Sequence, residues 1–278
     1  MELFEEVFNP GSIYDMLFFN VKAVLEHPTL NKLEEHNSAL HQRWKHISKI
    51  KHGFDINVRH FNSGGGIDET PEYAQKIYEE NAIYHPEFCK IIAITYGKIY
   101  YEEGKKKRYL KKIINNDEYL LIDTFMDVLR QISSDAVNSS PQYFLTLCGH
   151  NITNYDIPML LKRYLLYRDK FENDKKLPLL LKKCLSAKPW DSGIVDTVNV
   201  WKFNGNNYDT LMLISDYLQL KKTVSLEAMP EVSKEYWKQY EISPSDAQEY
   251  VALQSATQTN LVIQLMLELR EAGLPPNQ

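Results

Sequence analysis

The chain has 278 residues, of which 25% are charged, and its formal net charge is −5. This composition is that of a soluble globular protein with one large domain or two small ones. The negative charge argues against a general polyanion-binding surface but leaves room for a local basic groove. No run approaches the roughly 20 apolar residues of a membrane helix, and the acidic start lacks the order of a secretory signal. With three cysteines that are not paired at metal-ligand spacing, we expect reduced thiols and a cytoplasmic location.

The first strand is expected at Met16–Val21, a continuous apolar run that only Asn20 interrupts. From His27 the pattern loosens, and the next forty residues carry six of the eight histidines and a Ser-Gly-Gly-Gly tract at 63–66. A helix at Thr70–Tyr84, with a proline in its first turn, ends this region. The sequence therefore predicts a helical and loop insertion at about 27–84. A metal site among its histidines is a weaker alternative.

The middle of the chain predicts a hairpin and a helix. Phe88–Tyr96 is a strong strand pattern, and Lys98–Tyr101 is expected to pair with it by a turn around Gly97. Lys105–Lys112 contains six basic residues, which we interpret as a solvated hairpin tip, with a phosphate-contacting ridge as the alternative. Asp117–Ile132 has the spacing of an amphipathic helix with one apolar face.

A strand-to-helix junction follows. Tyr143–Cys148 is a short apolar run rich in β-formers and predicts a buried strand, which Gly149 ends. Helical spacing resumes at Ile157, so Asp156 stands where the carboxyl end of a strand presents polar groups to a crevice. An acidic side chain in that position is either a helix cap or a ligand for a cation.

Downstream, the pattern predicts a short strand and three helices, at Ile194–Thr197, Thr210–Leu220, Pro230–Tyr240 and from Ser243 to about Glu271. Strands that alternate with helices in this way indicate an α/β sheet covered on both faces.

Residues Gly149–Asp156 read GHNITNYD, and this run resembles the second motif of the DEDD (DEDDy-type) 3′–5′ exonuclease superfamily. The resemblance is to the branch of predicted exonucleases related to the exonuclease domain of family B DNA polymerases. Further similar stretches are Tyr84–Phe88, Lys188–Trp190, Val195–Thr197 and Trp201–Phe203. The resemblance implies one domain over residues 1–278 with a ribonuclease H-like fold, a mixed five-stranded sheet with helices on both faces.

In that superfamily, carboxylates from three places hold two divalent cations about 4 Å apart. The resemblance places the equivalent positions at Asn20 and Lys22 on the first strand, Asp156 at the second motif, and Tyr250 and Gln254 on the last helix. Three of the four carboxylates are therefore replaced. An ammonium about 4 Å from a divalent ion costs roughly 2 kcal/mol even in water. We expect catalysis to be absent or very weak, with no metal cofactor.

On a pleated strand Asn20 and Lys22 face the same side, which the resemblance directs toward Asp156. We expect the Lys22 ammonium to stand where a metal would bind and to pair with Asp156. The alternative is a Lys22 that extends to solvent and pairs with nothing. The resemblance also places Asn151, Tyr155 and Lys22 beside a substrate, although Asn151 has a simpler interpretation, which is to fix the loop after the strand.

Three functions stay open. The first is an exonuclease-like protein that holds single-stranded nucleic acid, with DNA the first expectation, in the old cleft without a metal. The second is an active 3′–5′ exonuclease dependent on magnesium or manganese, with Asp156, Asp196 and Glu26 as relocated ligands. The third is a protein-interaction module of a replication or repair assembly, which a cleft filled by side chains would favour. None of the three involves a membrane.

Overall fold

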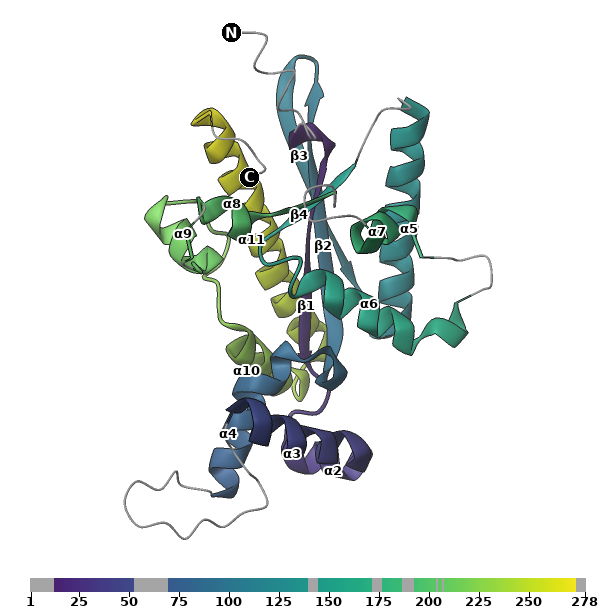
Figure 1. Ribbon diagram of the computed structural model, residues 1–278, viewed down its shortest axis with the longest axis vertical. Coiled ribbons are helices and arrows are strands. Elements are labelled where there is room, and N and C mark those ends of the chain that lie inside the picture. The colour runs from purple at the N-terminus through teal and green to yellow at the C-terminus, as the bar shows by residue number, and fades with distance from the viewer. Residues whose placement is uncertain are drawn as a thin grey trace.

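The computed structural model describes residues 13–52, 70–139, 145–171, 177–186, 193–203, 205–206 and 208–273. The chain is an α/β protein built on a five-stranded mixed sheet of order β3-β2-β1-β4-β5 (Figure 1). The strands are β1 (Met16–Leu25), β2 (Cys89–Glu102), β3 (Lys105–Ile114), β4 (Thr146–Gly149) and β5 (Ile194–Asp196). β1 is antiparallel to β2 and parallel to β4, and the two outer pairs are β2–β3, antiparallel, and β4–β5, parallel.

β1 is the central strand, and all ten of its residues are buried. It runs four residues beyond the predicted end at Val21, because Lys22 interrupts the apolar pattern but is itself buried at 4% exposure. Alternate side chains point to opposite faces, so Phe19 packs with Phe125 on one face while Phe18 joins the cluster beneath the last helix.

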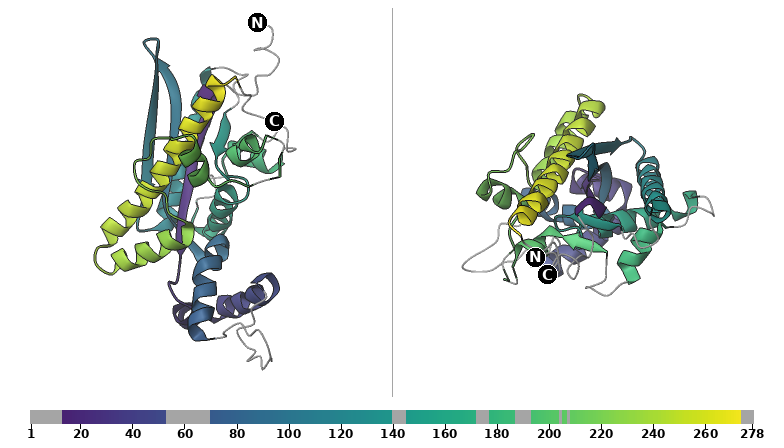
Figure 2. Two further views of the ribbon diagram at one scale, coloured as in Figure 1. Left: turned by 90° about the vertical axis from the view of Figure 1, so that its left-hand side faces the viewer. Right: turned by 90° about the horizontal axis from the view of Figure 1, so that it is seen from above.

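Helices cover both faces of the sheet (Figures 1 and 2). On one face lie α5 (Glu118–Ser139), α6 (Asp156–Leu166) and α7 (Leu179–Ser186). On the other lie α8 (Thr197–Trp201), α9 (Leu211–Tyr217), α10 (Met229–Tyr240) and the long α11 (Pro244–Glu271). None of these helices, nor any other in the described part of the chain, combines the length and apolar character needed to cross a membrane.

Residues 27–84, which were predicted to form a helical and loop insertion, lie between β1 and β2, and the elements of their described part are helical. It comprises α2 (Leu30–His36), α3 (Ser38–His52) and α4 (Pro71–Asn81). Trp44 of α3 is fully buried, with its ring 5.5 Å from that of Tyr78 and 5.4 Å from that of Phe88, so α3 packs onto α4 and onto the turn that precedes β2. His41, one of the histidines of this region, approaches the Glu34 carboxylate at 3.3 Å. The glycine tract at 63–66 lies outside the described residues.

The hairpin prediction around Gly97 was wrong. β2 runs through Gly97 to Glu102, the chain turns at Glu103 and Gly104, both with positive φ, and Lys105–Lys112 belongs to β3 and is not a tip. Gly97 is required by space, because a Cβ there would lie 2.6 Å from the Tyr109 carbonyl oxygen and 3.3 Å from Ile263 of α11. The glycine therefore marks a close approach between the sheet and α11.

Replacing Gly97 by Ala is expected to lower the free energy of unfolding by about 1–3 kcal/mol, the usual range for overpacking a filled interior. The control is Gly104→Asn, which keeps a residue type that tolerates the positive φ of the turn, has open space around it, and should change stability by under about 0.5 kcal/mol. Urea denaturation measures both. Equal stability of the two variants would contradict this role for Gly97.

Other boundaries were close. α5 is capped by Asp117, whose carboxylate accepts from the Tyr119 amide at 2.8 Å, but the helix continues past its predicted end at Ile132 to Ser139. Helices were predicted to begin at Thr70 and Ser243, and these residues are the N-caps of α4 and α11. Of the predicted strand at 143–148 and the Lys188–Trp190 stretch, residues 143–144 and 188–190 lie outside the described residues.

Candidate functional site

The candidate site is centred on Asp156, the first residue of α6. The loop after β4 brings α6 against β1, and the carboxylate is only 2% exposed. Its Oδ1 accepts a hydrogen bond from the Asn20 amide at 2.9 Å and one from the Val21 backbone N–H at 2.6 Å. The structure thus brings Asn20 of β1 and Asp156 of α6 together.

The other end of the Asn20 amide points into a buried chain of hydroxyl groups. Its Oδ1 accepts from Ser255 Oγ of α11 at 2.9 Å. Ser255 Oγ lies 2.8 Å from Thr95 Oγ1, which lies 2.6 Å from Thr259 Oγ1. An amide suits this place because it donates to Asp156 and accepts from Ser255, whereas an ionised carboxylate would put two like charges in contact.

Lys22 lies on the same face of β1 as Asn20, as expected, but it does not pair with Asp156. Its Nζ lies 3.4 Å from Met229 Sδ at the start of α10. Within the described part of the chain, no ion pair closer than 4 Å joins Lys22 to a carboxylate. The alternative of a solvent-extended lysine is also wrong, because the residue is 4% exposed. Asp156 is already held by Asn20 and Val21, and the lysine side chain runs past it toward α10.

Burial sets the protonation of this cluster. It raises the pKa of Asp156 to about 7, against the lowering effects of the Val21 N–H and the Lys22 charge. Burial lowers the pKa of Lys22 to about 8, against the raising effect of Asp156. Near neutral pH the carboxyl group is therefore close to its own midpoint, which makes it a poor permanent anion for a divalent cation.

Tyr250 and Gln254, the two predicted site residues on α11, form hydrogen bonds to the segment that precedes α10. Gln254, 2% exposed, donates from Nε2 to the Ser225 carbonyl at 3.0 Å and accepts from the Glu227 amide at 3.2 Å. The Tyr250 hydroxyl donates to the Glu227 carboxylate at 3.0 Å, and burial raises the pKa of Tyr250. Both side chains hold the segment before α10, and among the described residues neither is hydrogen-bonded to Asp156.

Asp196, the last residue of β5, is a structural carboxylate. Its Oδ1 accepts from the backbone amides of Asn151 at 2.8 Å and Val198 at 3.1 Å, and its Oδ2 accepts from that of Thr153 at 3.1 Å. Asn151 has a φ of +61°, and its side chain accepts from Asn154. These bonds fit the interpretation that Asn151 fixes the loop between β4 and α6.

The remaining predicted residues point elsewhere. The Tyr155 hydroxyl donates to the Ile83 carbonyl at 3.4 Å, and burial raises its pKa well above the usual range. Glu26 accepts from Arg163 Nη1 at 3.2 Å. Across the described ranges, no three His, Cys, Asp or Glu side chains form a group that could hold a metal ion, so relocated ligands at Asp156, Asp196 and Glu26 find no support.

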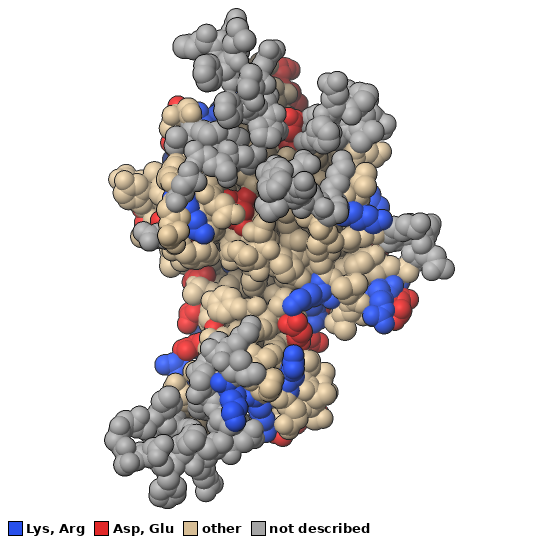
Figure 3. Space-filling view, in the orientation of Figure 1, with Lys and Arg blue, Asp and Glu red and all other residues tan. Residues whose placement is uncertain are grey.

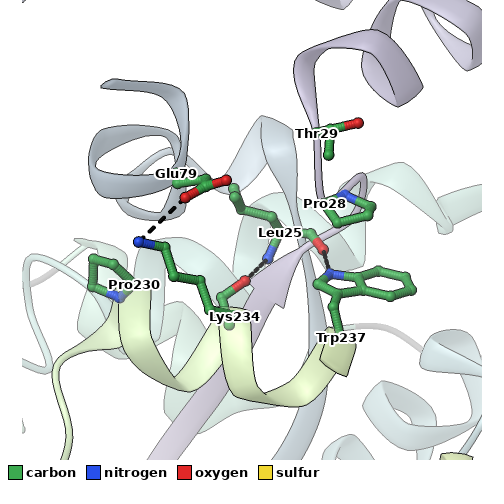
Figure 4. A pocket seen from close by; sticks show the side chains of 8 residues that line it. Leu25, Pro28, Thr29, Glu79, Pro230, Lys234 and Trp237 are labelled. Atoms are coloured by element: carbon green, nitrogen blue, oxygen red, sulfur yellow. Dashed lines mark hydrogen bonds and ion pairs between the residues drawn. The ribbon is translucent and has the colours of Figure 1, made fainter. Parts of the chain in front are cut away.

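The site is filled by its own side chains. Asn20, Lys22, Asp156 and Gln254 are each 2–4% exposed. The hollow in Figure 4 lies beyond them, at the end of β1. Its polar groups are satisfied internally, by an ion pair between Lys234 and Glu79 at 3.2 Å and by a bond from the Trp237 indole to the Leu25 carbonyl at 2.9 Å.

The sequence analysis did not anticipate the hydroxyl chain of Thr95, Ser255 and Thr259. A signal was present, since Ser255 and Thr259 are four residues apart and share the inner face of a helix. The fold and site together define an α/β protein with a buried Asn–Asp contact between its central strand and α6. No protein-family model, curated protein or solved structure matches the chain.

Proposed function

We propose that this chain is a ribonuclease H-like, 3′–5′ exonuclease-like protein, related to the exonuclease domain of family B DNA polymerases, that binds nucleic acid without hydrolysing it. The mixed five-stranded sheet with helices on both faces is compatible with that fold. The observation that carries the proposal is the state of Asp156. The last of four metal-binding carboxylates is buried, bonded to the Asn20 amide and the Val21 N–H, and close to neutrality.

Two-metal hydrolysis needs several anionic oxygen ligands around both ions. This site offers one carboxyl group, the amides of Asn20 and Gln254, and the buried ammonium of Lys22. The Asn20 NH₂ already donates to Asp156, so it presents hydrogen atoms where a cation needs lone pairs. The residues therefore do not fit a pair of divalent cations, and no step of a reaction is assigned to them.

Magnesium and manganese are accordingly expected to leave the melting temperature unchanged, and manganese-dependent release of nucleotides should be absent. The matched variant restores the ligands as Asn20→Asp, Lys22→Glu and Gln254→Asp. Metal at 100 times its dissociation constant should stabilise that variant by about 2.7 kcal/mol. Nucleotide release by the unmodified chain that stops in Asp156→Asn would overturn the proposal.

A protein-interaction module is the second candidate, and two observations favour it. Among the described residues, Asn20, Lys22, Asp156 and Gln254 are buried and form no open cleft for a strand at Asp156. An apolar groove lies between α9 and the end of α11, where Phe203, Leu213 and Tyr217 are 49%, 56% and 76% exposed. A titration with single-stranded DNA at low salt separates the two candidates, since only the first predicts binding.

A further inference from the structure

The hairpin of β2 and β3 concentrates positive charge. Six of the eight residues Lys105–Lys112 are basic in a chain whose net charge is −5, so the rest of the chain is the more acidic. On the face of the molecule in Figure 3, the coloured basic and acidic side chains are scattered among each other. The hairpin projects beyond the other strands (Figure 2), which makes it a local polyanion-attracting surface.

Strand geometry divides these charges between two faces. On the face toward α11, Lys106 and Lys112 are neutralised by Glu271, at 3.7 Å, and by Glu249. Arg108 lies on that face as well, because its register partner Ile99 is buried in the cluster under α11. Lys105, Lys107 and Lys111 have alternate positions in β3 and therefore lie on the opposite face. That opposite side of the β2–β3 hairpin is called the hairpin face below.

Tyrosines and lysines alternate on the hairpin face. Three successive cross-strand pairs each join a tyrosine to a lysine: Tyr96 with Lys111, Tyr109 with Lys98 and Tyr100 with Lys107. Tyr96 is buried against α5, whereas Tyr100 is 37% exposed and Tyr109 is half-buried. The ring centroids of Tyr100 and Tyr109 are 6.1 Å apart. The pattern leaves two accessible aromatic rings among the lysines.

The lysine charges on this face are only partly compensated. Lys107 pairs with Glu102, the single acidic residue among these register positions. Lys105 and Lys111 are exposed and form no ion pair with a carboxylate of the described residues. The Lys111 ammonium lies 5.7 Å from the Tyr109 ring centroid. Cations beside open aromatic rings are the two elements that single-stranded nucleic-acid sites combine.

We infer that the hairpin face binds single-stranded nucleic acid, with Lys105, Lys107 and Lys111 contacting phosphates and Tyr100 and Tyr109 stacking on bases. From Lys105 to Lys111 the strand rises about 20 Å, enough for a short strand. Lysines on an edge strand also prevent pairing with other chains, but that role needs no tyrosines between them. The inference rests on the proposed nucleic-acid function and places binding away from the filled Asp156 site.

The test compares two triple variants that each remove three positive charges from the same strand. The first is Lys105→Gln, Lys107→Gln and Lys111→Gln, and the control is Lys106→Gln, Arg108→Gln and Lys112→Gln. Affinity for oligo(dT) is measured by fluorescence anisotropy over a range of salt concentrations. The first triple should bind at least about tenfold more weakly and reduce the salt slope by about 2, whereas the control should change affinity less than about threefold.

Tyrosine substitutions keep the test independent of charge. Tyr100→Leu is expected to weaken oligo(dT) binding at least about fivefold. Tyr101→Leu, which alters a 57% exposed tyrosine on the opposite face, should leave the affinity unchanged. Duplex DNA and polyglutamate serve as further probes, and both should bind more weakly than oligo(dT). Equal affinity for polyglutamate would show a general polyanion or acidic-protein surface and overturn the inference.

The outcomes separate this inference from the proposed function. Equal losses in the two triple variants would overturn the hairpin face and leave nucleic-acid binding in place. No binding of oligo(dT) by the unmodified chain would overturn both. Metal-dependent hydrolysis is decided separately by the manganese assay, which none of these substitutions affects.

Discussion

Replacing Arg163 by Met should lower the free energy of unfolding by about 3–5 kcal/mol at neutral pH. Arg163 of α6 and Glu118 of α5 are 4% and 7% exposed, and their side chains meet through two hydrogen bonds, one of them 2.9 Å from Nε to Oε1. Without the guanidinium, the Glu118 carboxylate is left charged in the interior. A buried charge without its partner is among the most destabilising changes a single substitution makes.

Further contacts explain why Glu118 cannot move to solvent. Its Oε1 also accepts from the Ile91 amide of β2 at 2.6 Å, and its Oε2 accepts from the Tyr167 hydroxyl at 2.8 Å. Arg163 reaches on to Glu26 at the end of β1. The cluster therefore joins α5, α6 and two strands, and its loss should destabilise the whole sheet.

The matched control is Lys162→Met on the adjacent position of α6. Lys162 pairs with Glu87 at 2.8 Å, but both side chains are about half exposed, so the loss should stay under about 1 kcal/mol. Adding Glu118→Gln to Arg163→Met should recover part of the loss, because the uncompensated charge is removed. Urea denaturation of the four proteins measures these differences. An Arg163 variant as stable as the Lys162 variant would contradict the account.

Combining Lys22→Met with Asp156→Asn should raise the free energy of unfolding by about 1–4 kcal/mol near neutral pH, the range seen when buried charges give way to neutral groups of similar size. The amide introduced at position 156 would still accept from Asn20 and Val21 through its carbonyl oxygen. The thioether introduced at position 22 would pack against Met229. Urea denaturation at neutral pH is the measurement, and a double variant less stable than the parent chain would contradict it.

The pH dependence of stability gives a second measure of the same cluster. The pKa of Asp156 is raised from 3.8 to about 7, so the folded state holds a proton that the unfolded state releases, and stability falls as pH rises from about 4 to 7. The pKa of Lys22 is lowered from 10.5 to about 8, so stability returns as pH rises from about 8 to 10.5. Both slopes should disappear in the double variant. Equal stability of the parent chain at pH 5 and pH 7 would contradict the raised pKa of Asp156.

Local sequence signals predicted most of the helices and strands. Caps at Thr70, Asp117 and Ser243 begin helices because their side chains satisfy free backbone amides, a contact between near neighbours. The two clear errors concern residues whose roles depend on distant partners. Gly97 suggested a turn, yet it makes room for Tyr109 and α11, and Lys22 suggested the end of a strand, yet the strand continues buried.

The sequence alone shows the residue types at the positions of the site: an amide, an ammonium, one carboxyl group and a second amide. Their spacings resemble those of a metal-dependent exonuclease. That set already argues against two bound cations, because the kind of charge a side chain can carry is a property of its residue type. What each group contacts instead became clear from the folded chain. Asn20 bonds to residues 136 and 235 positions away, and Lys22 runs to Met229 and not to Asp156. Such contacts depend on how the sheet and α11 pack, and packing between distant segments leaves no periodic mark on the local sequence.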